Sequence, residues 1–469
     1  MVTTAPQAGP DKPQVAALLA ICIGFFMVSL DATVVNVALP NLEHGFRIGV
    51  SGLQWVVDAY TLTFAALLLS AGALGDRRGP KAIFQLGLTV FFLASALCGL
   101  APSASLVILG RIAQGIGAAL LVSTSLALLQ AVYTDPKDRA RAFGVWGGVG
   151  GVAVATGPVL GGLLVDLFDW RAVFFINLPL GIAGLLLARN YIPEPAGRAH
   201  KLDLPAQLLS FVALGSLTAG LIEAGPRGWT DRLVILALVL AVISGVLFVM
   251  VESRTRVPML PLSLFTSSRF SAANSIGFLI NFAFYGQLFV ATLYFQQVRD
   301  YSALRTGMAL LPQAITSALA AFASGRLAAE KGPRFPMMVG LSCGAITLFC
   351  WVFVGAHASY LLLVVPLVGA GFGVAMTAPA ATGVVMSAVP SQQGGVASGL
   401  INASRQTGSV LGVAVLGALV SSTHRFVDGL HLAVALAALA FGISLLLTVG
   451  FLRPPQQIEV PELLAGKAS

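Results

Sequence analysis

Three ionisable residues lie inside long apolar stretches of the sequence. Asp31 is the single charged residue between Val15 and Pro40, a stretch of 26 residues. As a helix this stretch would rise about 39 Å, against a membrane hydrocarbon core of about 30 Å. Asp58 and Arg111 also lie in apolar runs. Because a charged group inside a membrane is costly, it usually faces protein or water and has a function. We therefore expect Asp31, Asp58 and Arg111 to form a proton-coupling site.

The three residues fall at similar expected depths, about 8 to 10 Å below one end of their helices. Equal depth does not establish contact between them. Burial favours the neutral form of a carboxyl group, whereas a neighbouring arginine favours the carboxylate, so the two effects compete. Such a group can exchange protons near neutral pH. The alternative for each acid is a wetted position at the end of its helix.

The composition restricts the class of protein. Of the 469 residues, 57% are hydrophobic and only 10% are charged, which excludes an ordinary soluble domain and a disordered chain. The net charge of +8 comes from Lys and Arg in short loops between apolar runs, so we expect a lipid bilayer and no nucleic acid as partner. The four cysteines have no metal-binding spacing, the five histidines are scattered, and no phosphate-binding loop occurs. We therefore expect no metal and no cofactor.

Apolar runs separated by polar turns predict an all-α polytopic membrane protein with 14 transmembrane helices. The helices are expected to begin near Val15, Leu53, Ala82, Ser105, Ala142, Ala172, Leu204, Leu233, Phe270, Thr306, Pro336, Ser359, Gly399 and Leu432. They divide into an N-terminal tail (1–14), a six-helix bundle (15–192), two additional linker helices (193–256), a second six-helix bundle (257–453) and a C-terminal tail (454–469).

An even number of crossings places both termini on one side of the membrane. The loops and tails expected on that side hold 19 of the 27 basic residues. Cytoplasmic loops carry the excess of Lys and Arg in membrane proteins. Both termini are therefore predicted to be cytoplasmic, with the protein in the cell (inner) membrane.

One segment of the sequence recurs. GALGDRRGPK, from Gly72 to Lys81, returns 253 residues later as GRLAAEKGPR, from Gly325 to Arg334. Both copies follow an apolar run, although any cytoplasmic hairpin favours Gly, Pro and basic residues. Duplicated halves are common in secondary transporters, whose substrate site lies between the halves.

Several motifs together resemble the major facilitator superfamily, and in particular its fourteen-helix drug:proton antiporter branch. They are LDATVVNVALP near the N-terminus, GALGDRRGPK, RIAQGIGAA, TGPVLGG, DWRAVFFINLP, LYFQQVRDYSALRTG and SGLINASRQTGSVLG. The resemblance implies a conformational latch at Gly72, Asp76, Arg77, Gly79 and Lys81. It also implies that the fifth helix, through Gly157, Pro158, Gly161 and Gly162, lines the contact between the halves and favours exchange over uniport. Helix packing alone is the alternative explanation of these glycines.

Amides and aromatic residues inside the helices are the candidates for a substrate lining. They are Gln114, Asn281, Tyr285, Gln287 and Gln313. Such a lining suits a bulky, partly apolar ligand, which nearby acids would allow to be cationic. Asn402, Arg405 and Gln406 lie near the expected start of the thirteenth helix, and the sequence leaves open whether they gate or pack.

These observations predict a monomeric exporter, not an enzyme, that exchanges hydrophobic drug-like compounds for protons by alternating access, with the proton gradient as its energy source. One alternative is a proton-coupled or facilitative carrier of an endogenous metabolite. Another is an integral-membrane enzyme, which would need clusters of His, Cys, Ser or acidic residues that the sequence does not contain.

Overall fold

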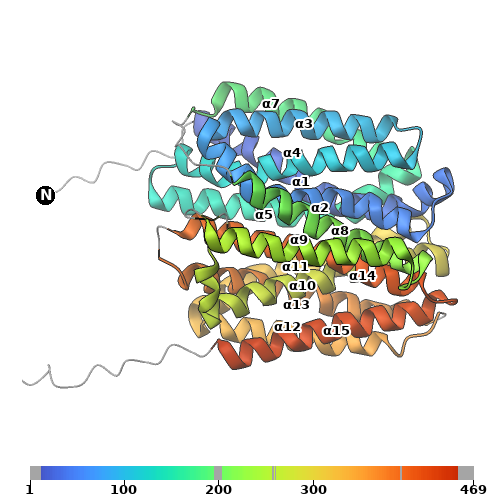
Figure 1. The fold of residues 1–469 in the computed structure, drawn as a ribbon. Helices are drawn as coiled ribbons and strands as arrows, with labels where there is room; N and C mark the ends of the chain where they lie inside the picture. The colour runs from blue at the N-terminus through green and yellow to red at the C-terminus, as the bar shows by residue number, and fades with distance from the viewer. Residues whose placement is uncertain are drawn as a thin grey trace, which may run out of the picture.

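The computed structural model is a bundle of long helices that lie roughly parallel to one another (Figure 1). It describes residues 12–194, 203–255, 258, 260–356, 358–390 and 393–452. The tail predicted at 454–469, most of the tail predicted at 1–14, and the first residues of the predicted linker beyond 194 lie outside these ranges. The described residues contain 14 helical spans that are long and apolar enough to cross a membrane, which confirms the predicted class.

The spans of the first half are α1 (Lys12–Phe46), α2 (Val50–Arg78), α3 (Pro80–Leu100), α4 (Ala104–Val132), α5 (Pro136–Leu167) and a sixth made of α6 (Ala172–Phe175) and α7 (Asn177–Tyr191). The two central helices are α8 (Leu204–Arg227) and α9 (Arg232–Arg254). After a 3₁₀ turn, η1 (Leu262–Thr266), the second half contains α10 (Ser268–Leu293), which ends in a π-helical turn, η2 (Tyr294–Val298), followed by α11 (Ala303–Lys331), α12 (Arg334–Trp351), α13 (Tyr360–Ser387), α14 (Gly394–Ser421) and α15 (Phe426–Phe451).

Most helices begin close to the predicted residues, and the exceptions have simple causes. α5 and α14 begin at Pro136 and Gly394, several residues before the expected starts, because the charged first turns of α5 and the glycine-rich first turn of α14 are also helical. The sixth span is interrupted at Ile176. Pro179 has no backbone N–H to donate to the carbonyl of Phe175, so the helical hydrogen bonding is broken at this point.

The two halves repeat the same packing. α1 packs against α5 and α7, and α4 packs against α2 and α3; in the second half α10 packs against α14 and α15, and α13 packs against α11 and α12. The repeated loops also share a conformation, because Gly79 and Gly332 both have positive φ values, 93° and 79°. Each lies between two helices and lets the chain reverse direction where an L side chain would be strained.

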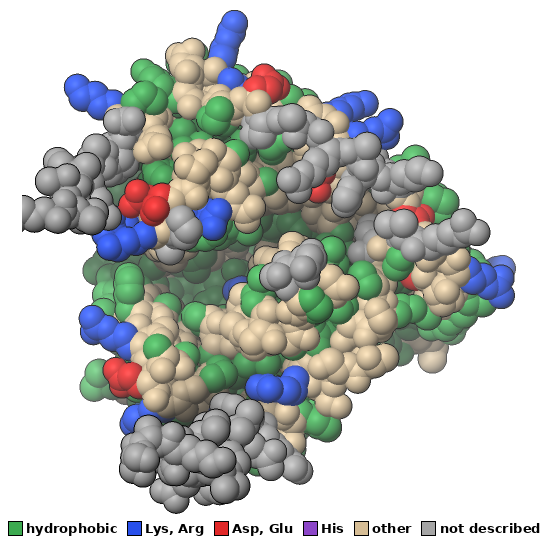
Figure 2. Space-filling model, turned by 90° about the vertical axis from the view of Figure 1, so that its left-hand side faces the viewer, with side chains coloured by type: hydrophobic (Ala, Val, Ile, Leu, Met, Phe, Trp, Pro, Cys, Tyr) green, Lys and Arg blue, Asp and Glu red, His purple; other side chains and the backbone are tan. Residues whose placement is uncertain are grey.

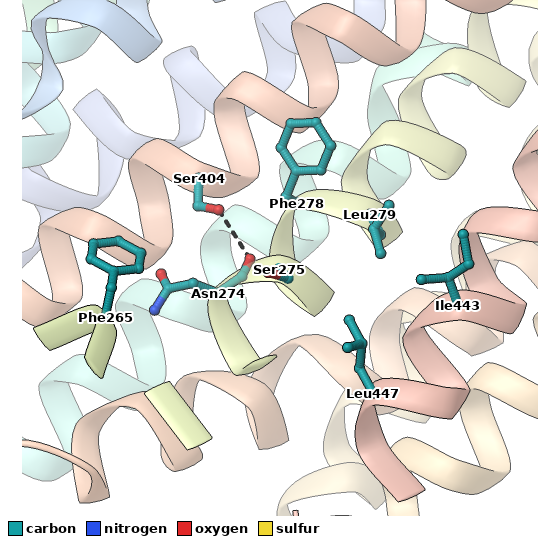
Figure 3. A pocket seen from close by; sticks show the side chains of 8 residues that line it. All are labelled: Phe265, Asn274, Ser275, Phe278, Leu279, Ser404, Ile443 and Leu447. Atoms are coloured by element: carbon teal, nitrogen blue, oxygen red, sulfur yellow. Dashed lines mark hydrogen bonds between the residues drawn. The ribbon is translucent and has the colours of Figure 1, made fainter. Parts of the chain in front are cut away.

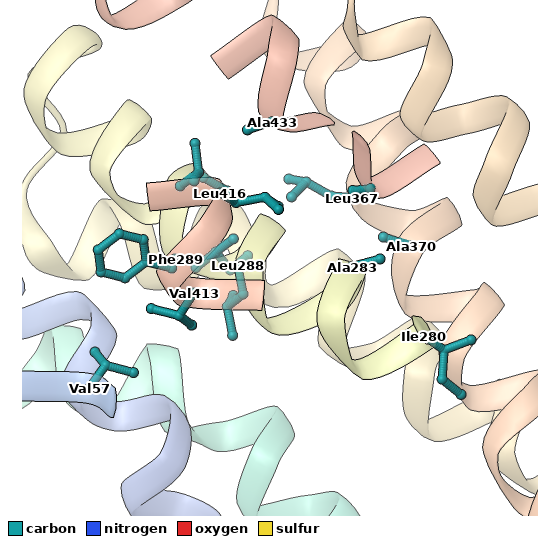
Figure 4. Close-up of a cluster of buried hydrophobic side chains, with 14 of the residues drawn as sticks. Val57, Ile280, Ala283, Leu288, Phe289, Leu367, Ala370, Val413, Leu416 and Ala433 are labelled. Carbon is teal, nitrogen blue, oxygen red and sulfur yellow. The ribbon is translucent and has the colours of Figure 1, made fainter. Parts of the chain in front are cut away.

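Two seams join the halves, and they are equivalent in the repeat: α5 packs against α11, and α14 packs against α2. The central pair α8 and α9 lies beside the second seam only, since α8 contacts α9, α2 and α14. One large apolar core runs through the second half and continues into the first, where it includes residues of α1 to α6; Figure 4 shows its members Val57, Phe289, Val413 and Leu416. A second core lies within α1 to α5 and α7.

Candidate proton-coupling and substrate site

A buried ion pair lies at the centre of the first half. Nη1 of Arg111, on α4, donates to Oδ2 of Asp31, on α1. The two side chains are 1% and 0% exposed, whereas the other three ion pairs among the described residues are substantially exposed. Because breaking such a pair strands a charge away from water, its protonation state is coupled strongly to the structure around it.

Polar side chains from three helices surround the carboxylate of Asp31. Its Oδ1 accepts from Nε2 of Gln114 at 3.1 Å and from Nδ2 of Asn177, on α7, at 3.3 Å. Both amides also donate to Oγ of Ser95, on α3, at 3.1 and 3.0 Å, and Ser95 donates to the carbonyl of Phe174 at 2.9 Å. α1, α3, α4 and α7 therefore meet at one fully hydrogen-bonded carboxylate.

Arg111 is also held by α2. Its Nε donates to the carbonyl of Val56 at 3.0 Å, and its guanidinium lies 4.3 Å from the ring centre of Tyr60. The hydroxyl of Tyr60 donates to the carbonyl of Val28 on α1 at 3.0 Å. Nη1 of Arg111 also donates to Oε1 of Gln114 at 2.9 Å. Arg111 would thus keep a carbonyl, an amide and an aromatic face as partners if Asp31 took up a proton.

Asp58 lies apart from this cluster. Neither of its carboxyl oxygens has a hydrogen-bond partner among the described residues, and the side chain is 0% exposed. One turn earlier, Gln54 donates to the carbonyls of Val413 and Ala414 on α14, at 2.9 and 2.8 Å. Residues four apart share a helix face, so Asp58 lies on the side of α2 that meets α14. Of the three residues expected to form one group, Asp31 and Arg111 form an ion pair, and Asp58 is a separate acid where α2 meets α14.

The amides of the second half form a smaller, neutral cluster. Nε2 of Gln313, on α11, donates to Oε1 of Gln287, on α10, at 3.1 Å, and both side chains are buried. The remaining polar atom of each, Nε2 of Gln287 and Oε1 of Gln313, has no partner in the described part of the chain. Asn281 is buried and donates to the carbonyl of Gly277, while Tyr285 is half-buried. Of the lining candidates, Tyr285 is therefore the most accessible.

The glycine motif of α5 lies between the two halves. A Cβ on Gly157 would clash with Oγ1 of Thr33, and one on Gly161 would lie 2.7 Å from the carbonyl oxygen of Val34, so both glycines face α1. Gly162 and Pro158 face α11 instead: a Cβ on Gly162 would lie 2.6 Å from the carbonyl oxygen of Ala303. α5 is thus packed tightly against a helix of each half.

The predicted latch is not engaged in this conformation. Asp76 and Arg77 are exposed and belong to none of the ion pairs found in the described ranges. Lys81 donates to the carbonyl of Arg189, at the end of α7, at 3.1 Å. Gly72 lies beside Ser123 of α4, and Gly79 ends α2.

The halves are in contact at one face of the molecule and separated at the other. We call the face where α1 begins the terminal face and the opposite one the far face. At the far face, Gln296 donates to the carbonyl of Val37 at 3.0 Å, and Oγ of Ser302 donates to Asp166 at 2.9 Å. Toward the terminal face, Gly144, Gly147, Gly148 and Gly151 of α5 have no neighbour within 4 Å of a Cβ position. Figure 2 shows the terminal face, with a hollow between the two halves and apolar side chains within it.

A separate pocket of about 440 Å³ lies within the second half, between α10, α14 and α15 (Figure 3). Its lining is apolar except for Asn274, Ser275 and Ser404. It contains no residue of the Asp31 cluster, so the pocket and the ion pair are different features.

Sequence reasoning missed Ser95, Asn177 and Tyr60. Each is a polar side chain inside an apolar span, which is the same signal that identified Asp31. Their neutral side chains are common in helices, and only the packing of α1, α3, α4 and α7 shows that they meet at one carboxylate.

Known proteins of similar sequence and structure agree with this geometry. Residues 21–413 match the family model of the Major Facilitator Superfamily. The chain is 38% identical over 448 residues to the methylenomycin A resistance protein of Bacillus subtilis, covering 95% of this chain and 96% of that one. It is 40% identical to the multidrug resistance protein Stp of Mycobacterium tuberculosis over 88% of this chain and 77% of that one.

Among solved structures, the fold matches a bacterial homologue of the human lysosomal transporter Spinster, crystallised in an inward-facing and unoccupied conformation. The TM-score is 0.68, with 18% identity over 95% of this chain and 100% of that chain. Repeated halves, a buried ion pair and a hollow between the halves thus occur in a chain that matches one family model over most of its length. The chain is a multi-pass membrane protein that belongs to the Major Facilitator Superfamily.

Proposed function

We propose that this protein exports hydrophobic, drug-like compounds across the cell membrane in exchange for protons. The printed names of its relatives support export, since they include resistance to methylenomycin A and to multiple drugs. The observation that carries proton coupling is the Asp31–Arg111 pair, an acid held inside the membrane-spanning part of the protein. Membership of a transporter family favours transport over an enzyme.

The fold supplies a route from this pair to the contact between the halves. Asp31 lies on α1, and two turns further along the same helix the carbonyl of Val37 accepts from Gln296 of the second half. The following residue, Gln297, donates to Glu43, which also lies on α1, at 2.5 Å. Protonation of Asp31 removes its attraction to Arg111 and loosens α1 against α3, α4 and α7. Movement of α1 is therefore coupled to closure of the far face.

Asp58 is the second candidate for a proton carrier. A buried carboxylate without hydrogen bonds is costly, whereas a neutral carboxyl in the same place is much less so. In the described conformation Asp31 is stabilised as a carboxylate by Arg111, and Asp58 is suited to the neutral form. The two acids would thus bind and release protons in different steps of the cycle.

The basic residues of the terminal face orient the protein. Arg77 and Arg78 lie in the last turn of α2, Lys81 lies in the first turn of α3, and Lys137, Arg139 and Arg141 lie in the first two turns of α5, all at the face with the hollow. By the positive-inside rule this face is cytoplasmic, so a compound would enter from the cytoplasm. For one proton, a potential of about 150 mV supplies roughly 3.5 kcal/mol, enough for a substrate gradient of a few hundred-fold.

The test is transport in everted membrane vesicles with and without a proton gradient. Wild-type protein should accumulate a substrate such as methylenomycin A only when the gradient is present. Asp31→Asn should abolish this dependence, because an amide cannot exchange a proton. Asp138→Asn is the matched control, since Asp138 forms an exposed ion pair with Arg141 at the membrane surface. Gradient-driven transport by the Asp31→Asn variant would contradict the proposal.

A further inference from the structure

Arg405 is a charged residue in the middle of α14. The helix begins at Gly394 rather than near Gly399, so Arg405 lies eleven residues from its start and sixteen from its end at Ser421. These spacings correspond to about 16 and 24 Å along the helix axis. Arg405 is therefore deep in the bilayer, where an arginine is costly unless it faces protein or water.

This arginine has no counter-charge in the described part of the chain. It belongs to none of the ion pairs there, and its guanidinium donates no hydrogen bond to a described residue. Arg111 is 1% exposed and paired with Asp31, whereas Arg405 is only half-buried. Arg405 is thus a cation that water and solutes can reach, at a depth where cations are normally neutralised.

The neighbours of Arg405 place it on the side of α14 that packs against α10. A Cβ on Gly277 of α10 would lie 3.3 Å from Cγ of Arg405. The absence of a side chain at Gly277 therefore leaves room for the aliphatic part of the Arg405 side chain. Tyr285, two turns further along α10, also lies near Arg405. Tyr285 in turn lies near Tyr60 of the first half, whose ring faces the guanidinium of Arg111. Two tyrosines therefore lie between the paired and the unpaired arginine.

We infer that Arg405 and Tyr285 bind an anionic group of the transported compound. The substrate class is then an amphipathic organic acid, with a carboxylate or a similar oxyanion on an apolar body. A guanidinium presents two parallel donors that match a carboxylate, and the tyrosine hydroxyl can donate a third hydrogen bond. The apolar walls of the hollow would accept the rest of the molecule (Figure 2). This inference rests on the proposed export function, and it replaces the expectation of a cationic substrate.

Charge movement follows from this assignment. When one proton enters and one monovalent acid anion leaves, two positive charges effectively move inward in each cycle. When the same proton exchanges for a neutral ester, one charge moves. A negative potential inside the cell therefore drives export of the acid more strongly than export of its ester.

Binding to the purified full-length protein tests the assignment with three probes that share one apolar body. They are pyrenebutyrate, its methyl ester and a pyrenebutyl trimethylammonium salt, and their fluorescence reports binding. The wild type should bind the acid at least about tenfold more tightly than the ester, which is roughly the contribution of one charge-assisted hydrogen bond. The cation should bind most weakly.

Two variants of Arg405 and one control complete the experiment. Arg405→Gln should bind the acid no better than the ester, and Arg405→Lys should keep part of the preference because an ammonium group pairs without the two-pronged geometry. Arg269→Gln removes the same charge at an exposed position at the start of α10 and should change nothing. Size-exclusion chromatography and thermal unfolding show that each variant is folded.

The outcomes separate this inference from the proposed function. A wild type that binds the ester or the cation as tightly as the acid, or that does not bind the acid, overturns the assignment. An Arg405→Gln variant that keeps the preference for the acid also overturns the assignment. The same holds if Arg405→Gln weakens binding of all three probes equally, because that result is expected when Arg405 only pairs with a carboxylate of the protein in another conformation. Asp31→Asn should keep the acid preference in binding. If the preference is present but no gradient-driven export occurs, the proposed function fails while the acid site stands.

Discussion

The two halves of this protein repeat the same helix packing and use their interiors differently. In the first half, Asp31 and Arg111 neutralise each other and almost every polar atom around them is hydrogen-bonded. In the second half, Gln287 and Gln313 form one neutral hydrogen bond, and Arg405 has no counter-ion among the described residues. The repeat thus preserves the scaffold, while one half holds a buried ion pair and the other holds neutral amides and an arginine that forms no ion pair among the described residues.

The largest expected difference concerns the buried polar pair of each half. Asp31→Ala leaves Arg111 buried without its counter-ion and should lower the free energy of unfolding by about 3–5 kcal/mol. Gln313→Ala removes a neutral hydrogen bond and should cost about 1 kcal/mol. Thermal unfolding in detergent measures both. If both variants lose the same free energy of unfolding, the ion pair does not stabilise the protein more than the neutral hydrogen bond.

The next comparison lies within α5. Gly157→Ala places a methyl group against Thr33 and should cost about 1–3 kcal/mol and slow export, because α1 and α5 can no longer approach. Gly151→Ala, on the same helix, meets no atom within 4 Å and should leave stability unchanged. Unfolding temperatures and vesicle transport rates test the pair together. A stable, active Gly157→Ala variant would show that the close packing is dispensable.

The repeated loops offer a comparison in which the halves should behave alike. Gly79→Ala and Gly332→Ala each place a side chain at a positive φ and should each cost about 1–2 kcal/mol. The same unfolding assay applies, with Gly355→Ala as a control outside the helices, where φ is not positive. Losses that differ by more than the experimental error would show that the two loops carry different strain.

The smallest expected effect separates the two tyrosines. Tyr60→Phe loses the hydrogen bond to Val28 and should be less stable by about 1 kcal/mol. Tyr285 donates no hydrogen bond within the described residues, so Tyr285→Phe should keep its stability and weaken binding of the acidic probe. If Tyr285→Phe destabilises the protein as much as Tyr60→Phe, the hydroxyl of Tyr285 has a structural role instead.

Much of the fold was predictable because membrane-spanning helices have a simple signature. Hydropathy gave the 14 spans, and the repeated glycine loop indicated the duplicated halves. The sequence predicted Asp31, Asp58 and Arg111 as one group and left open whether they touch. The structure pairs Asp31 with Arg111 and places Asp58 at the seam between α2 and α14. Hydropathy places a residue along its helix, whereas its neighbours depend on how the helices rotate and pack.

The depth of Arg405 could not be predicted, because the sequence did not show where its helix begins. Arg405 was expected near a helix start, because the glycine-rich segment from Gly394 to Ser398 does not resemble a membrane span. This segment is helical nonetheless, and the real helix begins a turn earlier. The depth of a charged residue in the membrane therefore depends on where its helix actually ends. A depth counted from the end of the apolar run alone is too small.

The position of α8 and α9 has a consequence for how a lipid-soluble molecule reaches the protein. They cover the α2–α14 seam, and α8 touches both halves there, so this flank is closed to the surrounding bilayer. Neither α8 nor α9 packs against α5 or α11 in the described part of the chain, so the α5–α11 seam has no such cover. The two extra helices thus make a symmetric scaffold one-sided, since only one of its two equivalent seams is shielded from the bilayer by additional helices.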